Sequence, residues 1–463
     1  MREPNGVTFI QPLTLSHFQA SKVSSLTPDE ANCMDVVVCH RLLRCIVGDV
    51  GRSSWHHLMK QAVSREPALF NAVVAFSALC NHHDEAKKTM RAWDPMATGV
   101  PEDVQLAIRN YGPCVLEMQN TMGDGEGRSI SVVLLCTLVC VCFELLMNSP
   151  DMAICHLDCG LQILVRNADV VDKDLARAFA RFDLQASVFL GLRPPLLASN
   201  SLELVYHSPR KASTHEDGEL AGLMNALFSF LRTKADDYRY RVPGSIPLDL
   251  LIEAKTIERR LHEFRENHLG KEITSRSTRM PSVTEAHLRV RCLTGTILAA
   301  TSLHAEEAIY DQFTCDFLGI VDAASEILSQ VPMSPVSEGS SPRPSAEISL
   351  DVAVIHPLYM TASKCRSSLI RRRAIELLRT APSLEAAWDA RSYANIAERL
   401  MQLEEACLEE QQPTDPAVVP EWCRIHSADI YPQNDGKLAK VVFRYRPNGM
   451  DGEWTDFSEM IAW

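Results

Sequence analysis

Apolar residues recur at intervals of three and four along most of the chain, the spacing that places them on one face of an α-helix. Between residues 173 and 190, for example, Leu175, Phe179 and Phe182 share such a face. The pattern predicts an all-α chain of packed antiparallel helices. The expected helices span residues 34–47, 67–82, 102–122, 130–147, 150–167, 173–190, 219–239, 247–268, 284–310, 312–331, 348–364, 367–380 and 383–410.

Most helix-breaking residues fall between these helices. Gly112 and Pro113 are exceptions, and they are expected to kink or divide the helix over 102–122 because proline lacks the N–H that a helix interior needs. The long, polar stretch 194–218 predicts a surface loop. Residues 332–346 contain four prolines and five serines, which predicts a flexible insertion that builds no core.

The spacing changes from helical to alternating near the C-terminus. Along residues 437–446 an apolar face that includes Val441 and Phe443 alternates with a largely basic face. Together with residues 423–431 this predicts two short strands that form a β-hairpin-like tail. Three aromatic residues are expected to anchor the end of the chain on the helical body: Trp454, Phe457 and Trp463.

These patterns divide the chain into three parts. Residues 1–30 are predicted to be a variable N-terminal segment, residues 31–412 a large all-helical region, and residues 420–463 a β-rich tail packed on that region. The length of 463 residues is thereby assigned mainly to one helical domain.

Composition excludes some function classes. The chain has 46 basic and 59 acidic residues, a net charge of −13, which is the wrong sign for a protein that coats nucleic acid electrostatically. Residues 130–147 are strongly apolar but barely reach the length of a membrane span and contain Glu144, so a helix buried in a large core is expected there. No membrane partner is predicted.

The fifteen cysteines are not spaced for zinc, since no Cys-x-x-Cys occurs. Residues 1–15 contain two prolines where a secretory leader needs an unbroken apolar stretch. Reduced, mostly buried thiols in an intracellular protein are therefore expected.

Motifs for common chemistries are missing: no phosphate-binding Gly-x-x-x-x-Gly-Lys-Ser/Thr loop, no Gly-x-Ser-x-Gly and no His-Glu-x-x-His occurs. Two histidine-containing clusters, at 56–57 and 82–85, resemble metal ligands in composition, but adjacent helical residues point about 100° apart. Residues 155–159, with Cys155, His156 and Cys159, are interpreted as part of a core helix. We therefore assign no catalytic, cofactor-binding or metal-binding residue and predict that the protein is not an enzyme.

Two further patterns have a functional and a structural interpretation. Residues 236–240, Asp-Asp-Tyr-Arg-Tyr, and the spacing of Asn225, Ser229 and Thr233 imitate the magnesium motifs of terpene-cyclase-like enzymes, but an acid is missing from each. Arg371-Arg372-Arg373 is the most basic local feature. It suits phosphate contact or nuclear import, but a solvated helix face whose arginines reach neighbouring carboxylates is favoured, because consecutive helical residues fan around the axis.

Five segments have the order and spacing of one known family. Residues 67–83 end in Ser-Ala-Leu-Cys-Asn-His-His, and residues 106–119 place a tyrosine before an apolar helix. Residues 132–164 join Phe-Glu-Leu-Leu to His-Leu-x-x-Gly-Leu, residues 356–379 contain Lys-Cys-Arg and Arg-Arg-Arg-Ala, and the tail from residue 441 reads VVFRYRPNGMDGEW. In this order they resemble the regulatory region of fungal zinc-binuclear-cluster transcription factors, the fungal-specific transcription factor domain family.

The resemblance implies a nuclear transcriptional regulator, and some members of the family control metabolic gene clusters. Members that bind DNA carry six cysteines that hold two zinc ions ahead of this region. Here Cys33, Cys39 and Cys45 are the only cysteines among the first fifty residues, and their spacing cannot close such a cage.

We therefore expect a regulator that lacks its own zinc-cluster module and acts through protein partners, a zinc-cluster factor among the candidates, with only indirect contact to DNA. A small-molecule effector and a homodimer are compatible with this prediction. Two alternatives stay open: a truncated DNA-binding zinc-cluster factor, and a helical-domain enzyme or ligand-binding protein of a biosynthetic pathway.

Overall fold

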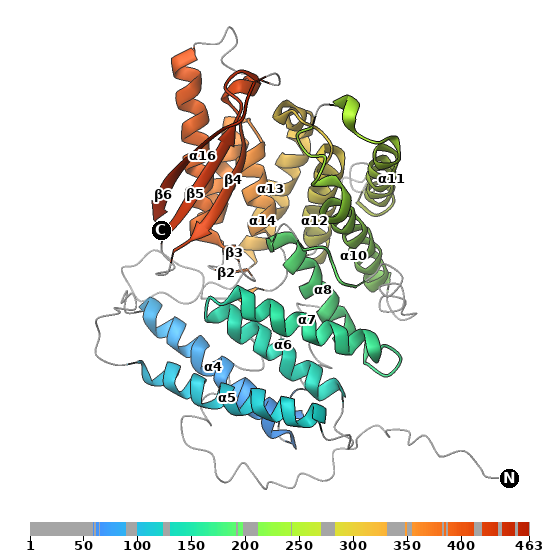
Figure 1. Cartoon of the computed structure of the whole chain (residues 1–463), viewed down its shortest axis with the longest axis vertical. Helices are drawn as coiled ribbons and strands as arrows, with labels where there is room; N and C mark the ends of the chain where they lie inside the picture. Colours follow the sequence, from blue (N-terminus) through green and yellow to red (C-terminus); the bar gives the residue numbers. More distant parts are fainter. Residues whose placement is uncertain are drawn as a thin grey trace, which may run out of the picture.

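The computed structural model describes most of the chain beyond residue 58 (Figure 1). The described residues are 59, 62–63, 65–88, 100–123, 130–190, 193–197, 212–241, 243–269, 283–330, 348–349, 354–381, 384–385, 388–411, 419–433, 438–449 and 452–462. The expected helix over 34–47, the variable segment 1–30 and the insertion 332–346 lie outside them. Among the described residues, no helix combines the length and hydropathy that a membrane crossing requires.

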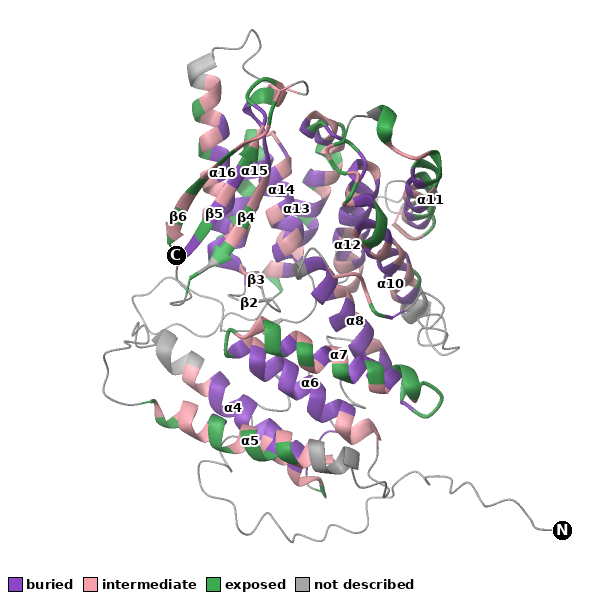
Figure 2. Cartoon of the chain, in the orientation of Figure 1, coloured by how far each residue is buried: buried purple, intermediate pink, exposed green. Residues whose placement is uncertain are grey.

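The first helices form a bundle around their own hydrophobic core, in the lower half of Figure 1. Its members are α4 (Pro67–Lys88), α5 (Glu102–Gly123), α6 (Ile130–Leu146), α7 (Pro150–Arg166) and α8 (Lys173–Leu190). Helix α6 is the most apolar of them and is buried on nearly all sides, as expected for residues 130–147. Figure 2 shows α6 coloured as buried along most of its length.

A second group of helices encloses a second core. Its α-helices are α10 (Ala212–Phe230), α11 (Leu248–Phe264), α12 (Val283–Thr301), α13 (Thr314–Ser329), α14 (Ile355–Lys364), α15 (Ser368–Thr380) and α16 (Ala390–Gln411). Short turns join or extend them: π-helical turns Leu231–Ala235 and Arg265–Leu269, and 3-10 turns Pro243–Ser245, Glu307–Phe313 and Glu421–Cys423. Helix α8 links the groups, since most of its buried residues belong to the first core whereas Val188 belongs to the second.

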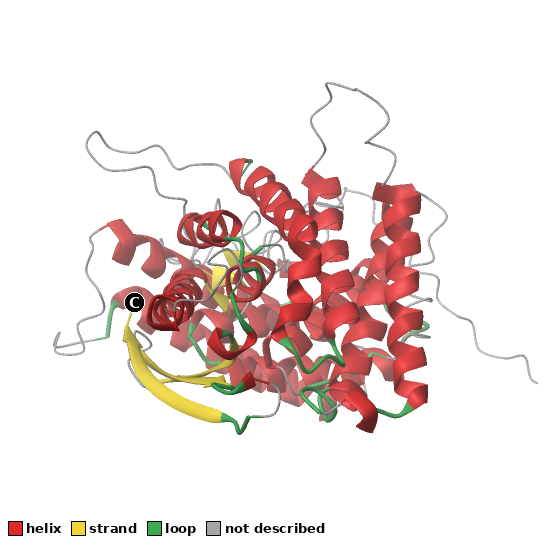
Figure 3. Cartoon of the chain, turned by 90° about the horizontal axis from the view of Figure 1, so that it is seen from above, coloured by secondary structure: helices red, strands yellow, loops and turns green. Residues whose placement is uncertain are grey.

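The tail is an antiparallel sheet of three strands, β4 (Ile425–Pro432), β5 (Leu438–Tyr445) and β6 (Thr455–Ala462), in the order β4-β5-β6. The sheet curves along one edge of the helical body (Figure 3). Val441 and Phe443 are fully buried against Ile396 and Leu400 of α16. The tail therefore packs on the helical body, and it contains a third strand in addition to the two that the alternation predicted.

Close packing leaves Gly160 without room for a side chain. A Cβ atom added at Gly160 of α7 would collide with the ring of Phe179 on α8 and lie 2.9 Å from Cγ2 of Thr137 on α6. Because glycine permits this approach, the three helices meet at residue 160.

The all-α fold class is confirmed, and so are most of the expected helices: α8 spans 173–190 as predicted, and α4, α6, α7, α13 and α15 differ only near their ends. The expected helix over 102–122 was predicted to be kinked or divided at Gly112 and Pro113. It is not divided. The helix runs through Gly112 and Pro113, which are both exposed, so that the carbonyl left without an N–H partner can face water.

Four other boundaries were wrong because tertiary contacts override the local pattern. The expected helix over 284–310 ends at Thr301 and is followed by a 3-10 turn. The helices expected from 348 and 383 begin only at Ile355 and Ala390, since Ile348–Ser349 and Leu384–Glu385 pair as parallel strands.

The fourth is the loop expected over 194–218, of which α10 occupies the last part from Ala212. The start of this segment is fixed, because the buried carboxylate of Asp183 accepts hydrogen bonds from the backbone N–H groups of Leu196 and Leu197 at 3.1 and 2.8 Å.

The described cysteines differ in two respects from the expectation of reduced, buried thiols. Cys407 and Cys423 form a disulfide that joins α16 to the turn before β4. Among the other described cysteines, Cys155, Cys159 and Cys315 are exposed. The remaining described thiols are buried: Cys80, Cys114, Cys136, Cys140, Cys142, Cys292 and Cys365.

Candidate functional site

A cluster of buried charge lies where α14, α15 and α16 meet the tail. At its centre is Glu404 of α16, which is completely buried. Its Oε1 accepts hydrogen bonds from Nη2 of Arg366 and from the backbone N–H of Ile425, both at 2.8 Å, and its Oε2 lies 2.7 Å from Nη1 of Arg371. Burial alone would raise the pKa of Glu404, but the two guanidinium groups outweigh it and hold this pKa below its ordinary value.

A second buried anion, Glu307, continues this cluster. Its carboxylate accepts a hydrogen bond from Nζ of Lys364 at 2.7 Å and one from Nη1 of Arg366 at 3.2 Å. Burial lowers the pKa of Lys364 to about 8 even though Glu307 opposes the shift. Lys364 also donates to the backbone carbonyl of His426 in β4, at 2.7 Å, so that the charge cluster reaches the sheet.

The tail contributes groups of both signs to the junction. Arg424, one of the largest fully buried side chains, donates two hydrogen bonds to Asp311 at 2.9 and 2.6 Å. Glu421 accepts the backbone N–H groups of Glu307 and Ala308 at 2.8 and 2.9 Å. We call these residues the junction network: Glu307, Asp311, Lys364, Arg366, Arg371, Glu404, Glu421 and Arg424. Its described members pair with each other, which indicates that they hold the sheet against the helices rather than form a reaction centre.

The arginine run 371–373 reaches neighbouring carboxylates as the favoured interpretation predicted, but the expectation of a solvated face holds only for Arg372 and Arg373, since Arg371 is 3% exposed. Arg371 is buried against Glu404, Arg372 pairs with Glu405 and Arg373 pairs with Asp322, at 2.7, 2.5 and 2.6 Å. Each guanidinium therefore meets a carboxylate of a neighbouring helix.

The residues that imitate magnesium motifs make structural contacts. Asp236 accepts a hydrogen bond from Arg232 at 2.9 Å, Asn225 donates to the carbonyl of Leu197 at 3.2 Å, and Thr233 donates to the carbonyl of Ser229. The two motifs therefore present no set of free carboxylates, which a magnesium site needs.

Tyr240, the last residue of the acidic motif, contacts the tail from the turn that follows α10 and residues Leu231–Ala235. Its backbone is left-handed, with φ of 66°, a conformation that is costly for a tyrosine and persists where neighbours impose it. The ring meets His426 and Trp454 edge-on, the hydroxyl donates to the carbonyl of His426 at 3.0 Å, and the carbonyl of Tyr240 accepts from Arg446 at 3.1 Å. Trp454 thus anchors the tail as expected, whereas Trp463 lies outside the described residues.

His156 of α7 points away from Cys155 and Cys159, which share an exposed face of the helix. Nε2 of His156 lies 2.9 Å from the hydroxyl of Tyr111, which donates a 2.5 Å hydrogen bond to the carboxylate of Glu144 on α6. Burial lowers the pKa of His156, although Glu144 opposes the shift. Tyr111, Glu144 and His156 thus connect α5, α6 and α7 inside the first bundle. Within the described part of the chain, no three His, Cys, Asp or Glu residues are arranged to hold a metal ion.

Of the remaining histidines singled out in the sequence, His82 lies half-buried near the end of α4. His56 and His57, the side chains of residues 83–85, and Cys33, Cys39 and Cys45 lie outside the described residues.

The exposed side of α11 carries neighbouring apolar side chains and a shallow hollow. Leu248, Leu251 and Ile252 are 71%, 38% and 58% exposed, an unusual position for three aliphatic side chains at helical spacing. A shallow hollow of about 370 Å³ follows them along the helix, between Leu251, Ile252, Lys255, Thr256 and Arg259. We call these six residues the α11 face.

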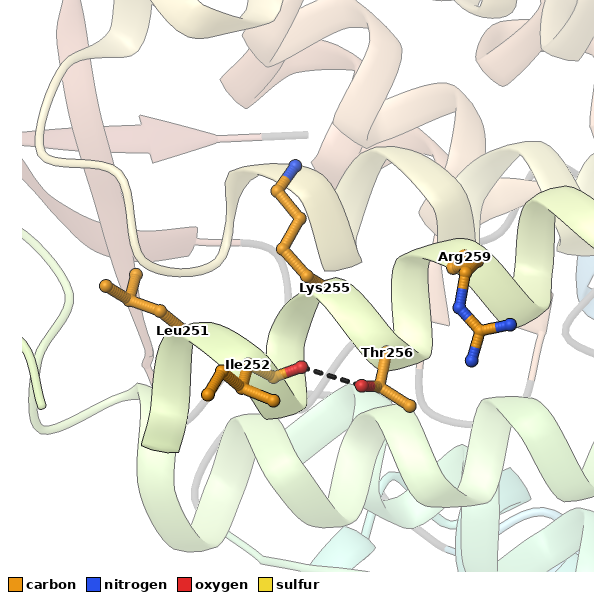
Figure 4. A pocket seen from close by; sticks show the side chains of 5 residues that line it. All are labelled: Leu251, Ile252, Lys255, Thr256 and Arg259. Atoms are coloured by element: carbon orange, nitrogen blue, oxygen red, sulfur yellow. Dashed lines mark hydrogen bonds between the residues drawn. The ribbon is translucent and has the colours of Figure 1, made fainter. Parts of the chain in front are cut away.

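Figure 4 shows Lys255 and Arg259 extending to opposite sides of the hollow. Both cations pair with acids of their own helix, Lys255 with Glu258 at 2.7 Å and Arg259 with Glu263 at 2.6 Å. Such exposed pairs contribute little, about 0–1 kcal/mol, so an incoming acid can replace the partner at small cost. One helix supplies the whole lining, so the hollow cannot enclose a small molecule as a ligand pocket does, but it can receive side chains from another protein.

Comparisons with known proteins identify no relative. No family model matches the chain. Neither the curated proteins nor the solved structures include a significant match.

Proposed function

We propose that this chain is a nuclear protein that regulates transcription through protein partners and contacts DNA only indirectly. The observation that carries the proposal is the order of the five family-like segments in the sequence. The helical body built from four of them, with the fifth folded onto it as the tail, is consistent with a regulatory domain of that family.

The charges of the chain support indirect contact with DNA. The arginines of residues 371–373 are neutralised by carboxylates of the protein itself, so they have little charge left to displace counterions from a phosphate backbone. The net charge of −13 acts in the same direction.

The α11 face supports the protein-binding part of the proposal. We assign to it an amphipathic helix of a partner protein, with apolar side chains that cover Leu248, Leu251 and Ile252 and acidic side chains that reach Lys255 and Arg259. Covering three partly exposed aliphatic side chains contributes on the order of a few kcal/mol, which suits a reversible regulatory contact.

A tethered reporter assay tests the proposal. The chain is fused to an unrelated DNA-binding module and measured on a reporter of intermediate basal activity, so that activation and repression both register. We expect the fusion to shift reporter output and the double variant Leu251→Asp/Ile252→Asp to abolish the shift without lowering protein abundance. A fusion that leaves the reporter at the level of the DNA-binding module alone contradicts the proposal.

A matched control separates the α11 face from general surface charge. Ile108 and Leu116 of α5 are 53% and 60% exposed, so Ile108→Asp/Leu116→Asp makes the same change on another helix. We expect this control to behave as wild type. If both double variants fail equally, the partner does not bind through the α11 face.

A further inference from the structure

Strand β6 forms one edge of the C-terminal sheet. The strand order β4-β5-β6 places it last, along the left side of the sheet in Figure 1. In the described part of the chain, its main chain bonds to β5 and, through the carbonyl of Ala462, to the side chain of Asn395 on α16 at 3.1 Å. Edge strands of this kind present N–H and C=O groups that can pair with a strand of another molecule.

The register of the sheet shows which main-chain groups of β6 point outward. The carbonyl of Leu438 in β5 accepts a hydrogen bond from the backbone N–H of Gln433 at 2.8 Å, so the main-chain groups of Leu438 face β4. These groups alternate sides along an antiparallel strand, and Leu438 lies opposite Ala462 of β6. The contact of the Ala462 carbonyl with Asn395 agrees with this alternation. Even-numbered residues of β6 therefore point their N–H and C=O groups away from β5: Asp456, Ser458, Met460 and Ala462.

The opposite edge of the sheet is protected against pairing. Strand β4 contains a bulge near Ile425 and ends at Pro432. The N–H of Ile425 donates to Glu404, and the carbonyl of His426 accepts from Lys364. Strand β6 contains neither lysine nor proline and pairs with β5 in unbroken register. Because bulges, prolines and covered main-chain groups prevent edge pairing, the difference between the two strands favours pairing at β6.

We propose that β6 pairs with β6 of a second copy of this chain, antiparallel and about a two-fold axis at Ser458. An axis perpendicular to the sheet keeps the inner faces of both copies on the same side. In this register Ser458 lies opposite its own copy, and Asp456 of each strand lies opposite Met460 of the other. These three pairs of outward residues exchange two backbone hydrogen bonds each, and the two sheets join into one.

The charges of β6 favour a second copy as its partner. The strand has two charged residues, Asp456 and Glu459. Arg444 and Arg399 of the same chain neutralise them, at 2.8 and 2.7 Å, so an added strand need not supply a basic residue. An axis at Glu459 would place two carboxylates directly opposite each other, which destabilises a strand pair, whereas an axis at Ser458 places no like charges directly opposite.

Sedimentation velocity of the full-length chain tests the proposal. Two eight-residue strands make a small interface compared with the about 1,600 Å² of a standard stable complex, so the dimer should dissociate in the micromolar range. We expect the average mass to rise from 51.6 kDa toward twice that value as the concentration crosses this range. Ser458→Pro removes the N–H at the axis, which faces away from β5 in the monomer, and should abolish the dimer.

Charge variants at Ser458, which is exposed, test the position of the axis. Ser458→Lys and Ser458→Glu each place like charges directly opposite and should each weaken the dimer about fivefold, whereas their equimolar mixture should dimerise more tightly than either variant alone. Tyr431→Lys adds a lysine at an exposed position of the other edge strand, β4, and is expected to match wild type.

Three results would overturn the proposal. A wild-type chain that stays monomeric throughout leaves the edge of β6 to an extended segment of another protein. A dimer that Ser458→Pro leaves unchanged forms through another surface. A mixture of the two charge variants that dimerises no more tightly than either variant alone excludes an axis at Ser458, and this comparison holds even if the proline variant folds poorly.

Discussion

Replacing Glu404 with glutamine removes one negative charge from the junction network at nearly constant volume. In wild type the carboxylate accepts hydrogen bonds from Arg366 and from the backbone N–H of Ile425, and it forms an ion pair with Arg371. Glutamine retains an oxygen that can accept from Ile425, but it cannot neutralise the two guanidinium groups. Arg366 keeps its contact with Glu307, so the uncompensated charge falls mainly on Arg371, whose side chain is 3% exposed.

Removing one partner from a buried ion pair costs about 3–5 kcal/mol, because the other charge stays buried without compensation. We expect Glu404→Gln to lose about 3 kcal/mol, the lower end, since glutamine can still form hydrogen bonds. The neighbouring residue supplies a matched control. Glu405 pairs with Arg372, but these side chains are 38% and 54% exposed, so Glu405→Gln should change stability by about 0–1 kcal/mol.

Urea unfolding followed by tryptophan fluorescence measures both variants, with the midpoint and slope fitted separately. The pKa of Glu404 is lower in the folded chain than in the unfolded chain. The ionised carboxylate therefore adds to the free energy of unfolding at any pH above the ordinary carboxyl pKa. This stabilisation is lost as the pH falls through the pKa of Glu404 in the folded chain. The stability gap between wild type and Glu404→Gln should therefore narrow in acid. Equal losses in Glu404→Gln and Glu405→Gln at neutral pH would refute the reasoning.

Three further predictions concern packing, pH dependence and the first bundle. Gly160→Ala should destabilise by about 1–3 kcal/mol through overpacking, whereas Gly112→Ala, where an added Cβ meets no atom within 4 Å, should gain about 0.5–1 kcal/mol of helix propensity; thermal unfolding compares the two. Burial lowers the pKa of Lys364 to about 8, so the folded chain binds fewer protons than the unfolded chain above that pH. The stability of wild type relative to Lys364→Met should accordingly rise between about pH 8 and 10.5, by at most about 3 kcal/mol, and a flat difference in urea midpoints over that window contradicts the assignment. Tyr111→Phe should cost about 1–3 kcal/mol because the buried carboxylate of Glu144 loses its hydroxyl donor, and calorimetry showing no loss would mean that water replaces this donor.

Helices with a clear apolar stripe could be predicted from sequence almost to the residue. Helix α8 is the best example, since one face is buried and the carboxylate of Asp172 caps its first turn at Asp174 N–H. The late starts of α14 and α16 could not be predicted in this way. They depend on pairing between Ile348–Ser349 and Leu384–Glu385, two segments whose contact leaves no local signal.

In strand β6, an ion pair obscures the alternation of apolar and polar residues that predicts a strand. Its burial alternates along Thr455–Ala462, with Phe457 and Ile461 on the inner side. Glu459 shares this side, where it forms two 2.7 Å contacts with Arg399 of α16, while Met460 points outward and is 54% exposed. A charged residue inside and an apolar residue outside cancel the alternation that would have predicted a strand.

The α11 face could not be predicted from the sequence for a related reason. Leu248, Leu251 and Ile252 have the spacing of core residues, and the sequence alone cannot tell which apolar positions of α11 face the core. Packing decides this: Leu250, Ile257 and Leu261 are buried, and the other three are left in solvent. For the arginine run, by contrast, the contacts with carboxylates could be predicted, because consecutive positions on a helix point in different directions, but the burial of Arg371 against Glu404 could not.

Transcript profiling tests the central proposal, transcriptional regulation through a partner, most directly. The native gene is replaced in its own host by a deletion, by the Leu251→Asp/Ile252→Asp variant and by the Ile108→Asp/Leu116→Asp control, with a fluorescent fusion to follow localisation. We predict a nuclear protein, a defined set of transcripts that change on deletion, the same set changed by the α11 variant, and a control that matches wild type. A deletion strain whose transcripts equal those of wild type, with the fusion outside the nucleus, would contradict regulation of transcription by this chain.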